Sequence, residues 1–239
     1  MKWTEPIKVN SHDTDYNGVL RASGVLKYMQ EAANMQLHEL GPSNDELMEQ
    51  GQTFFLSRIG FLTYEPIAAY EELRAQSWAG KSRGFSFNRF YRIYRGDIVV
   101  AEGVSVWALL DMNTHHPLRV DSYHANFEID ETLALDLPAH FRMPKPTEEM
   151  ERVGSYTVLY DDLDKNMHMN NTRYPDMLLS TQDMRGKYAQ SLVINYVNEA
   201  PLGEVLSIYS CCDGDTLYLK SVRRDGKTNA EAQLKLKDL

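Results

Sequence analysis

The feature that most limits how this chain can fold is a polar pattern that occurs twice at a constant distance. Each copy places two aspartates and one asparagine at alternate positions, and corresponding residues lie 149 positions apart. The two copies are Asp13, Asp15 and Asn17, and Asp162, Asp164 and Asn166. In a chain of 239 residues, a repeat at this distance predicts two similar halves packed against each other. The copies differ where the second has His168 and the first has Val19.

Hydrophobic periodicity predicts the same order of elements in each half: a strand, a helix and then a four-stranded antiparallel meander. In the first half we expect a helix from Ser23 to Leu40, ended by Gly41 and Pro42, and strands at 2–9, 54–64, 72–78, 85–94 and 98–110. In the second half we expect a helix that begins at 174–179, and strands at 153–160, 191–197, 205–212, 216–223 and 228–236. Because apolar helices must be covered, this pattern favours an α+β fold in which each antiparallel sheet wraps around a long helix.

After the helices, the sequence offset between corresponding residues of the two halves becomes smaller. Residues 70–77 align with 203–210, an offset of 133. The first half therefore holds about sixteen extra residues, which we expect in the loop after its helix, since loops accept insertions most easily.

A stretch rich in Pro, Ala and acidic residues separates the halves and is typical of a linker. We predict a domain at 1–118, a linker at 119–150 and a second domain at 151–239. The linker should be extended because of Pro138, Pro144 and Pro146.

Composition narrows the class of protein. Hydrophobic residues make up 43% and charged residues 25% of the chain, as in ordinary globular proteins, whereas the net charge of −9 disfavours nucleic-acid binding. No apolar run reaches the roughly 18 residues of a membrane span, and the N-terminus does not resemble a signal or transit peptide. The only cysteines, Cys211 and Cys212, are adjacent, which fits a reducing compartment. We therefore expect a cytoplasmic protein.

One stretch of this acidic chain is basic, with Lys81, Arg83, Arg89, Arg92 and Arg95. Solvated strand faces and cross-strand ion pairs explain most such clusters. A docking site for an acidic partner is the alternative interpretation.

The second copy of the repeat is the best candidate for chemistry. Four polar residues stand at alternate positions, which predicts that they share one side of an extended segment: Asp162, Asp164, Asn166 and His168. The N-cap types Asn170, Asn171 and Thr172 follow, and unpaired N–H groups at such a helix start could stabilise a developing oxyanion. The alternative is that these residues only form turns and caps, with His168 in a solvated loop.

The segment DLDKNMHMNNTRY, from Asp162 to Tyr174, resembles the D-L-D-x-N-x-H-x-N-N-x-x-Y signature of acyl-ACP thioesterases, which release fatty acids from acyl carrier protein (ACP). WALLDMNTHHPLRV, from Trp107 to Val120, is similar to the end of that family's first domain. The resemblance covers essentially the whole chain. It implies two tandem hotdog domains and a cytosolic member of bacterial type.

The resemblance also implies catalytic roles for Asp164, Asn166, His168 and, in the segment VNEAPLGE, Glu199. Plant members have a cysteine after this acid, whereas this chain has Ala200. A covalent acyl-cysteine mechanism at this position is therefore excluded, which leaves water as the nucleophile. We interpret Glu199 as the base that activates this water.

In this hypothesis Asp164 holds Asn166 and His168, which bind the carbonyl or the water. The roles of Asp164 and Glu199 could be exchanged, and we interpret Asp162 as a turn or cap residue. In the first half Pro66 occupies the position of Glu199 and Val19 that of His168. One working site is therefore expected in the second half, with the helix and sheet of the first half lining the acyl tunnel. Candidates for that lining are Met29, Ala32, Ala33 and Met35, although core packing is their more usual role.

The implied partner is ACP bearing a fatty acyl phosphopantetheine thioester, and we expect neither a metal nor an organic cofactor. Nucleic acid and membranes are not expected as partners, and the protein could be a monomer or a homodimer. An acyl-CoA thioesterase and a non-catalytic acyl-binding protein are the alternatives. A hotdog hydratase or dehydratase fits the motif less well.

Overall fold

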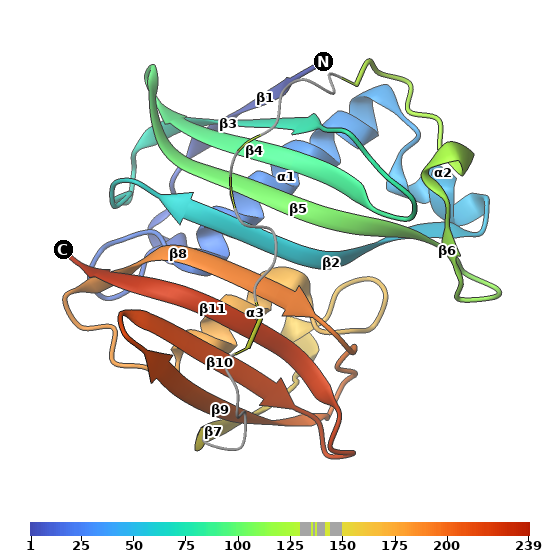
Figure 1. Ribbon diagram of the computed structural model, residues 1–239. Coiled ribbons are helices and arrows are strands. Elements are labelled where there is room, and N and C mark those ends of the chain that lie inside the picture. Colours follow the sequence, from blue (N-terminus) through green and yellow to red (C-terminus); the bar gives the residue numbers. More distant parts are fainter. Residues whose placement is uncertain (130–134, 136, 138–141, 144–149) are drawn as a thin grey trace.

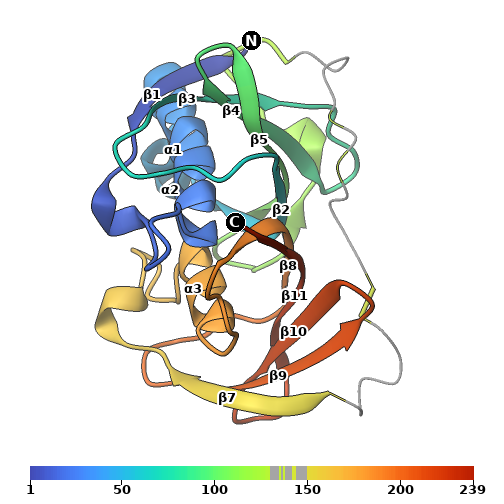
Figure 2. The same ribbon diagram turned by 90° about the vertical axis from the view of Figure 1, so that its left-hand side faces the viewer.

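The computed structural model describes residues 1–129, 135, 137, 142–143 and 150–239. In these ranges an 11-stranded antiparallel sheet runs through the molecule in the order β1-β3-β4-β5-β2-β8-β11-β10-β9-β7, with β6 paired to β5 (Figure 1). The strands are β1 (Trp3–Lys8), β2 (Gln52–Thr63), β3 (Glu72–Ala79), β4 (Phe87–Arg95), β5 (Ile98–Asp111), β6 (Pro117–Leu118), β7 (Glu151–Thr157), β8 (Lys187–Tyr196), β9 (Val205–Asp213), β10 (Thr216–Val222) and β11 (Thr228–Asp238). The helices α1 (Ala22–Leu40), α2 (Asn44–Glu49) and α3 (Tyr174–Leu179) lie on one face of this sheet (Figure 2). None of the described helices combines the length and apolar character needed to cross a membrane.

The two halves repeat the same sheet, in the orders β1-β3-β4-β5-β2 and β7-β9-β10-β11-β8. Isolated bridges repeat as well: Thr14↔Leu20 corresponds to Leu163↔Met169, and Val19↔Ala68 corresponds to His168↔Pro201. Both residues of the first bridge have the offset of 149. In the second bridge Val19 and His168 are 149 positions apart, and Ala68 and Pro201 are 133 apart. The internal repeat is therefore confirmed in three dimensions.

The predicted four-stranded meander is wrong in one respect. β3, β4 and β5 follow one another, but β2 pairs with β5 instead of β3, because α1 crosses the face of the sheet and delivers the chain to the far side of β5. The other edge of β2 pairs with β8 from Arg58↔Asn195 to Leu62↔Ser191. This pairing satisfies the backbone groups of two strands that would otherwise be exposed edges, and it joins the two sheets.

A long helix is present only in the first half. α1 has 19 residues and begins at Ala22, so Ser23 lies inside the helix and not at its N-cap; it ends at Gly41, whose φ of 70° suits glycine. α3 has six residues after a three-residue 3-10 turn, so the expectation of a long helix in each half is wrong. The hydroxyls of Ser180 and Thr181 donate to carbonyls of its last turn, which favours termination there. Most of the extra residues of the first half therefore lie in the helix itself, and not in the following loop.

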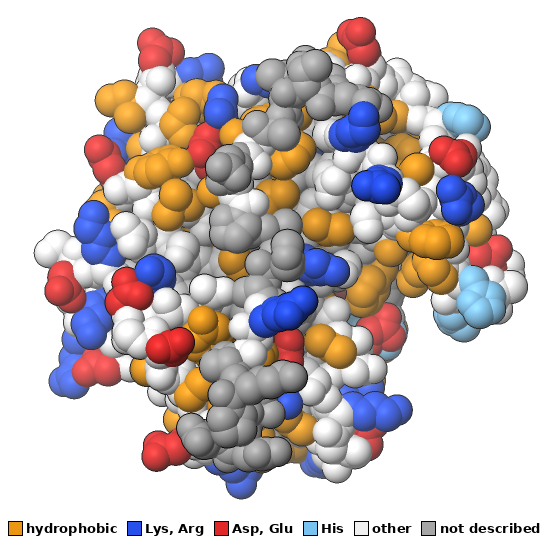
Figure 3. Space-filling view, viewed as in Figure 1, with side chains coloured by type: hydrophobic (Ala, Val, Ile, Leu, Met, Phe, Trp, Pro, Cys, Tyr) orange, Lys and Arg blue, Asp and Glu red, His pale blue; other side chains and the backbone are white. Residues whose placement is uncertain are grey.

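The basic stretch does not form a patch of free cations. Arg92 pairs with Glu102 at 2.7 Å, Arg95 pairs with Glu71 at 2.7 Å, and Arg89 is buried. Acidic and basic side chains are interspersed over the face shown in Figure 3. The interpretation as cross-strand pairing accounts for Arg92 and Arg95, and the docking-site alternative has no support from these residues.

The first part of the predicted linker packs on the first half. The Tyr123 ring contacts the edges of Phe54 and Phe87, with ring centroids 5.3 and 5.6 Å apart. Leu135 and Leu137 pack against a separate small cluster formed by Trp78, Phe90 and Val104. The three prolines expected to extend the linker lie outside the described residues, and the division at 118 and 150 stays a prediction.

Candidate active site

The second copy of the repeat forms a tight turn and not the predicted extended segment. The Asp164 N–H donates to the His168 carbonyl at 2.9 Å, and the Met167 N–H donates back to the Asp164 carbonyl at 3.0 Å. The Asp164 carboxylate accepts the Asn166 N–H at 2.8 Å, an Asx turn that explains the local Asp-x-Asn spacing. Met167 has a φ of 63° where the first copy has Gly18 at 76°. The chain therefore reverses here, and Asp162 is separated from the other three residues of the pattern.

Asp162 points away from the turn and into the protein. Its carboxylate accepts hydrogen bonds from the Tyr156 hydroxyl at 2.8 Å and the Leu159 N–H at 2.9 Å, and it pairs with Arg173 at 3.1 Å. The side chain is fully buried. Its contacts agree with the predicted capping role, and they anchor the start of the loop against the 3-10 turn ahead of α3.

Two N–H groups at the start of the helical segment are already hydrogen-bonded. The Asn170 side chain accepts the Thr172 N–H at 2.9 Å, and the Asn170 carbonyl accepts the Arg173 N–H at 2.9 Å. The expectation that these two groups are free for an oxyanion is wrong, because the cap residue that marks a helix start also satisfies its donors.

The structure brings the four predicted site residues together. Asp164, Asn166, His168 and Glu199 all line one groove of about 450 Å³. His168 Nε2 lies 3.2 Å from a carboxylate oxygen of Glu199, and both side chains are partly exposed to the groove. The bridge from His168 to Pro201, with the hydrogen bond from the Met169 N–H to the Ala200 carbonyl at 3.0 Å, holds the two loops side by side.

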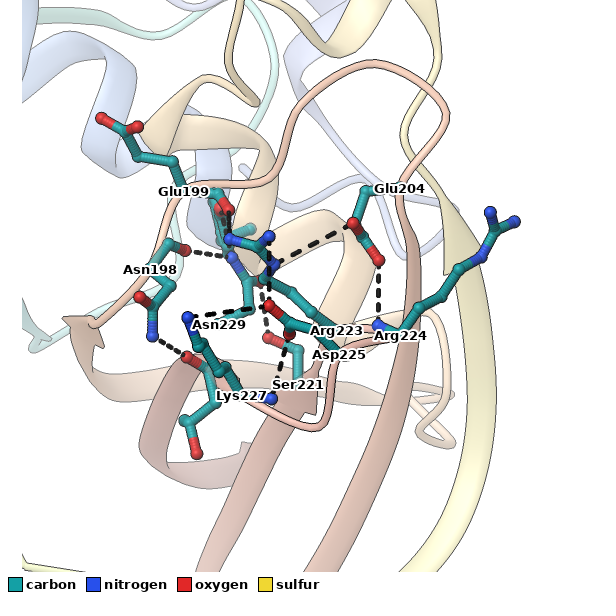
Figure 4. A network of polar contacts seen from close by, with 11 residues as sticks. Asn198, Glu199, Glu204, Ser221, Arg223, Arg224, Asp225, Lys227 and Asn229 are labelled. Carbon is teal, nitrogen blue, oxygen red and sulfur yellow. Dashed lines mark hydrogen bonds and ion pairs between the residues drawn. The ribbon is translucent and has the colours of Figure 1, made fainter.

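A network behind Glu199 holds its backbone. Arg223 Nη1 donates to the Glu199 carbonyl at 3.1 Å, and the guanidinium is flanked by Asp225 at 3.4 Å and Glu204 at 3.9 Å. Buried Asn229 donates to the Asn198 carbonyl. Figure 4 shows the Glu199 carboxylate pointing away from this network. The contacts therefore fix the main chain and leave the acid group free to face the groove.

Arg223 and Asn229 were missed by sequence reasoning. They lie 24 and 31 positions from the backbone groups that they bind, with Arg223 directly after β10 and Asn229 near the start of β11. No local pattern at these positions indicated contact with the segment around Glu199.

The floor of the groove is aromatic and uncharged. Tyr174 is buried and packs edge-on against Tyr196, with ring centroids 5.1 Å apart. Burial raises the pKa of the Tyr174 hydroxyl to about 12; the hydrogen bond from Asn229 acts in the opposite direction, and the charges of Glu199 and Asp164 add to the rise. Tyr174 is therefore protonated at neutral pH and adds no further negative charge beside the two acids.

An apolar pocket of about 150 Å³ adjoins the groove and is built mainly by the first half. The pocket and the groove share Met48, Thr53 and Phe54 on one side and Lys165 and Asn166 on the other. The α1 residues that line it are Ala33, Asn34 and Leu37. Of the four candidates for the lining, Ala33 is confirmed, Met29 and Ala32 are fully buried in the core, and Met35 does not line this pocket.

The first copy of the repeat has a different function. Asn17 donates to the carbonyls of Met184 at 2.8 Å and Lys187 at 3.1 Å, and it accepts the Gly186 N–H at 3.1 Å. Asp15 makes the same Asx turn as Asp164, with the Asn17 N–H 2.8 Å away. This copy therefore holds the two halves together, with Val19 where the other has His168.

Loss of Arg223 should weaken catalysis without abolishing folding. We expect Arg223→Met to lower kcat about 10- to 100-fold with little change in KM, because small displacements of a reacting group have effects of this size. Arg224→Met is the matched control, since only the backbone N–H of Arg224 contacts Glu204 and its side chain points away (Figure 4). Steady-state kinetics on both folded variants measure the difference. Equal kcat values would show that Arg223 does not position Glu199.

Two family models match the chain in succession. The acyl-ACP thioesterase N-terminal domain matches residues 1–126, and the acyl-ACP thioesterase C-terminal domain matches residues 145–237. These matches place the chain among the thioester hydrolases. It belongs to the acyl-ACP thioesterase family, as the motif around His168 indicated.

Solved structures share the fold over the whole chain. An acyl-ACP thioesterase from Bacteroides thetaiotaomicron has a TM-score of 0.88 at 20% identity, covering 99% of this chain and 98% of that one. The 12:0-ACP thioesterase from Umbellularia californica has a TM-score of 0.85 at 15% identity, covering 100% and 98%. At these identities the likeness shows the fold alone. No curated protein sequence matches the chain.

Proposed function

We propose that the groove hydrolyses the thioester of a fatty acyl-ACP with a water molecule activated by Glu199. The observation that carries this proposal is the 3.2 Å contact between His168 and Glu199 at a groove continuous with an apolar pocket. A base paired with an imidazole can accept a proton from water. The adjoining apolar walls suit an acyl chain. On the same grounds we infer that the two halves are tandem hotdog units, of which only the second carries the acid and imidazole.

In the proposed reaction Glu199 takes a proton from water while the water oxygen forms a bond to the thioester carbonyl carbon. The Asn166 amide and His168 donate hydrogen bonds to the oxygen that becomes negative. The carbon–sulfur bond then breaks, and the leaving thiolate takes the proton from Glu199. Asp164 keeps Asn166 in place through the Asx turn.

The four residues have unequal support for these roles. Glu199 contacts His168 directly, whereas one Asp164 oxygen is occupied by the Asn166 N–H. This difference favours Glu199 over Asp164 as the base. The alternative is that Asp164 itself acts as base or nucleophile. Mutagenesis of both acids distinguishes the two assignments.

The donor can be tested with matched substrates. ACP and CoA present the acyl group on the same phosphopantetheine arm, so only the protein or nucleotide beyond the arm differs. We expect kcat/KM for medium-chain acyl-ACP to exceed that for the same acyl-CoA by at least about tenfold, with electrostatic and surface contacts to ACP providing the difference. Release of free acid is measured for each donor. Equal turnover of both would identify an acyl-CoA thioesterase, and ligand binding without turnover of either would identify a non-catalytic acyl-binding protein.

A further inference from the structure

A buried arginine stands at the edge of the apolar pocket. Arg89 lies on the inner face of β4, lines the pocket and is 8% exposed. Its Nε donates to the Ser77 hydroxyl at 2.8 Å, and one terminal nitrogen donates to the Gln36 side-chain oxygen. Across the described ranges, no carboxylate lies within ion-pair distance of Arg89. Since a guanidinium has five N–H donors, most of its hydrogen-bonding capacity is unused.

Two more buried polar atoms near Arg89 have no hydrogen-bond partner among the described residues. They are the Nε2 of Gln36, which is fully buried, and the hydroxyl of Tyr123, which lines the pocket. Burial raises the pKa of Tyr123 to about 12, against the opposite effect of the Arg89 charge, so the hydroxyl keeps its proton. All three groups can donate hydrogen bonds, and buried donors in native proteins normally have an acceptor.

The sheet places this cluster away from the thioester site. Thr53 and Phe54 of β2 border both the groove and the pocket, and β5 and β4 follow β2 in the sheet. With neighbouring strands about 4.8 Å apart, Arg89 on β4 lies roughly 10 Å across the sheet from β2. A cavity of about 150 Å³ is known to accommodate a benzene-sized molecule. The distal end of a short to medium acyl chain would therefore reach the cluster.

We propose that the enzyme acts on acyl chains whose far end carries a carboxylate, which binds Arg89 and Tyr123 in the pocket, with Gln36 supporting Arg89 from behind. The inference rests on the proposed function, because it assumes that the thioester lies in the groove. A carboxylate is an acceptor with two oxygens and matches the guanidinium in charge and geometry. A methyl-terminated chain of equal length would give neither the buried cation nor the Tyr123 hydroxyl an acceptor.

The test compares three acyl-ACPs of equal chain length that end in a methyl group, a hydroxyl or a carboxylate. We expect kcat/KM to be at least about tenfold higher for the carboxylate than for the methyl terminus, with the hydroxyl between them, since sites with buried donors discriminate strongly against groups that cannot accept. Arg89→Met should abolish this preference, measured as the ratio of kcat/KM for the carboxylate-terminated chain to that for the methyl-terminated chain. If Arg89→Met does not fold, Tyr123→Phe should reduce the preference without removing the cation.

The outcomes separate the two proposals. Hydrolysis of the methyl-terminated chain as fast as, or faster than, the carboxylate would overturn the inference and leave the thioesterase function intact. If none of the acyl-ACPs is hydrolysed, the proposed function fails. Binding of the corresponding acyl amides, with and without the terminal carboxylate, then tests the cluster directly by calorimetry. Equal affinity for both amides in the wild-type protein would overturn the inference.

Discussion

Replacing Glu199 by alanine is expected to lower kcat/KM for acyl-ACP by about 10³-fold, within the range that general acid–base groups contribute. The variant loses the carboxylate that lies 3.2 Å from His168, while the backbone contacts from Arg223 and Asn229 remain. Asp164→Ala should also reduce activity strongly, because the Asx turn that places Asn166 loses its acceptor. Release of free fatty acid by the folded variants is the measurement.

The chain contains a matched control for Asp164. Asp15 makes the same Asx turn in the other half, where no imidazole or Glu199 counterpart is present, so Asp15→Ala should leave kcat close to the wild-type value. A smaller effect of Glu199→Ala than of Asp164→Ala would favour Asp164 as base or nucleophile. Near-wild-type activity in both variants would refute the site.

Replacing Asp162 by alanine is expected to destabilise the protein by about 3 kcal/mol, because three hydrogen-bond donors lose one buried acceptor. The substitution leaves Arg173, the Tyr156 hydroxyl and the Leu159 N–H without their shared acceptor. Equilibrium unfolding in urea, monitored by circular dichroism, measures the loss. Activity of the remaining folded protein should fall too, since Asp162 anchors the turn that carries His168.

Asp13 is the counterpart of Asp162 in the first half and provides the comparison. Its side chain is 16% exposed and contacts the Tyr28 hydroxyl at 3.1 Å and Lys27 at 3.4 Å. Asp13→Ala should therefore cost only about 1 kcal/mol, as expected for a hydrogen bond in a partly hydrated place. Equal losses of unfolding free energy in Asp162→Ala and Asp13→Ala would show that the burial of Asp162 does not determine the size of the destabilisation.

Local features were predictable where the determinants lie within a few residues. Alternating apolar residues indicated the strands, Gly41 marked the end of α1, and the Asp-x-Asn spacing marked two turns. The same spacing misled when it was read as an extended strand, because Asx turns and strands can both place polar residues two apart. Only the left-handed backbone at Met167 reveals that the chain reverses.

By itself, the sequence determined the duplication, the order of the elements, the family motif, and the loss of the imidazole and acid from the first half. Tertiary structure alone decided that β2 pairs with β5 and β8, that α3 stops after six residues, and that Arg223 reaches Glu199. It also decided that Arg89, one of five basic residues in a single stretch, is buried with no carboxylate partner in the described part of the chain. Periodicity and turn chemistry depend on neighbouring residues, so they can be read from the sequence. Strand partners and side-chain burial depend on which distant segments compete for the same backbone donors and apolar surface, so they require the tertiary structure.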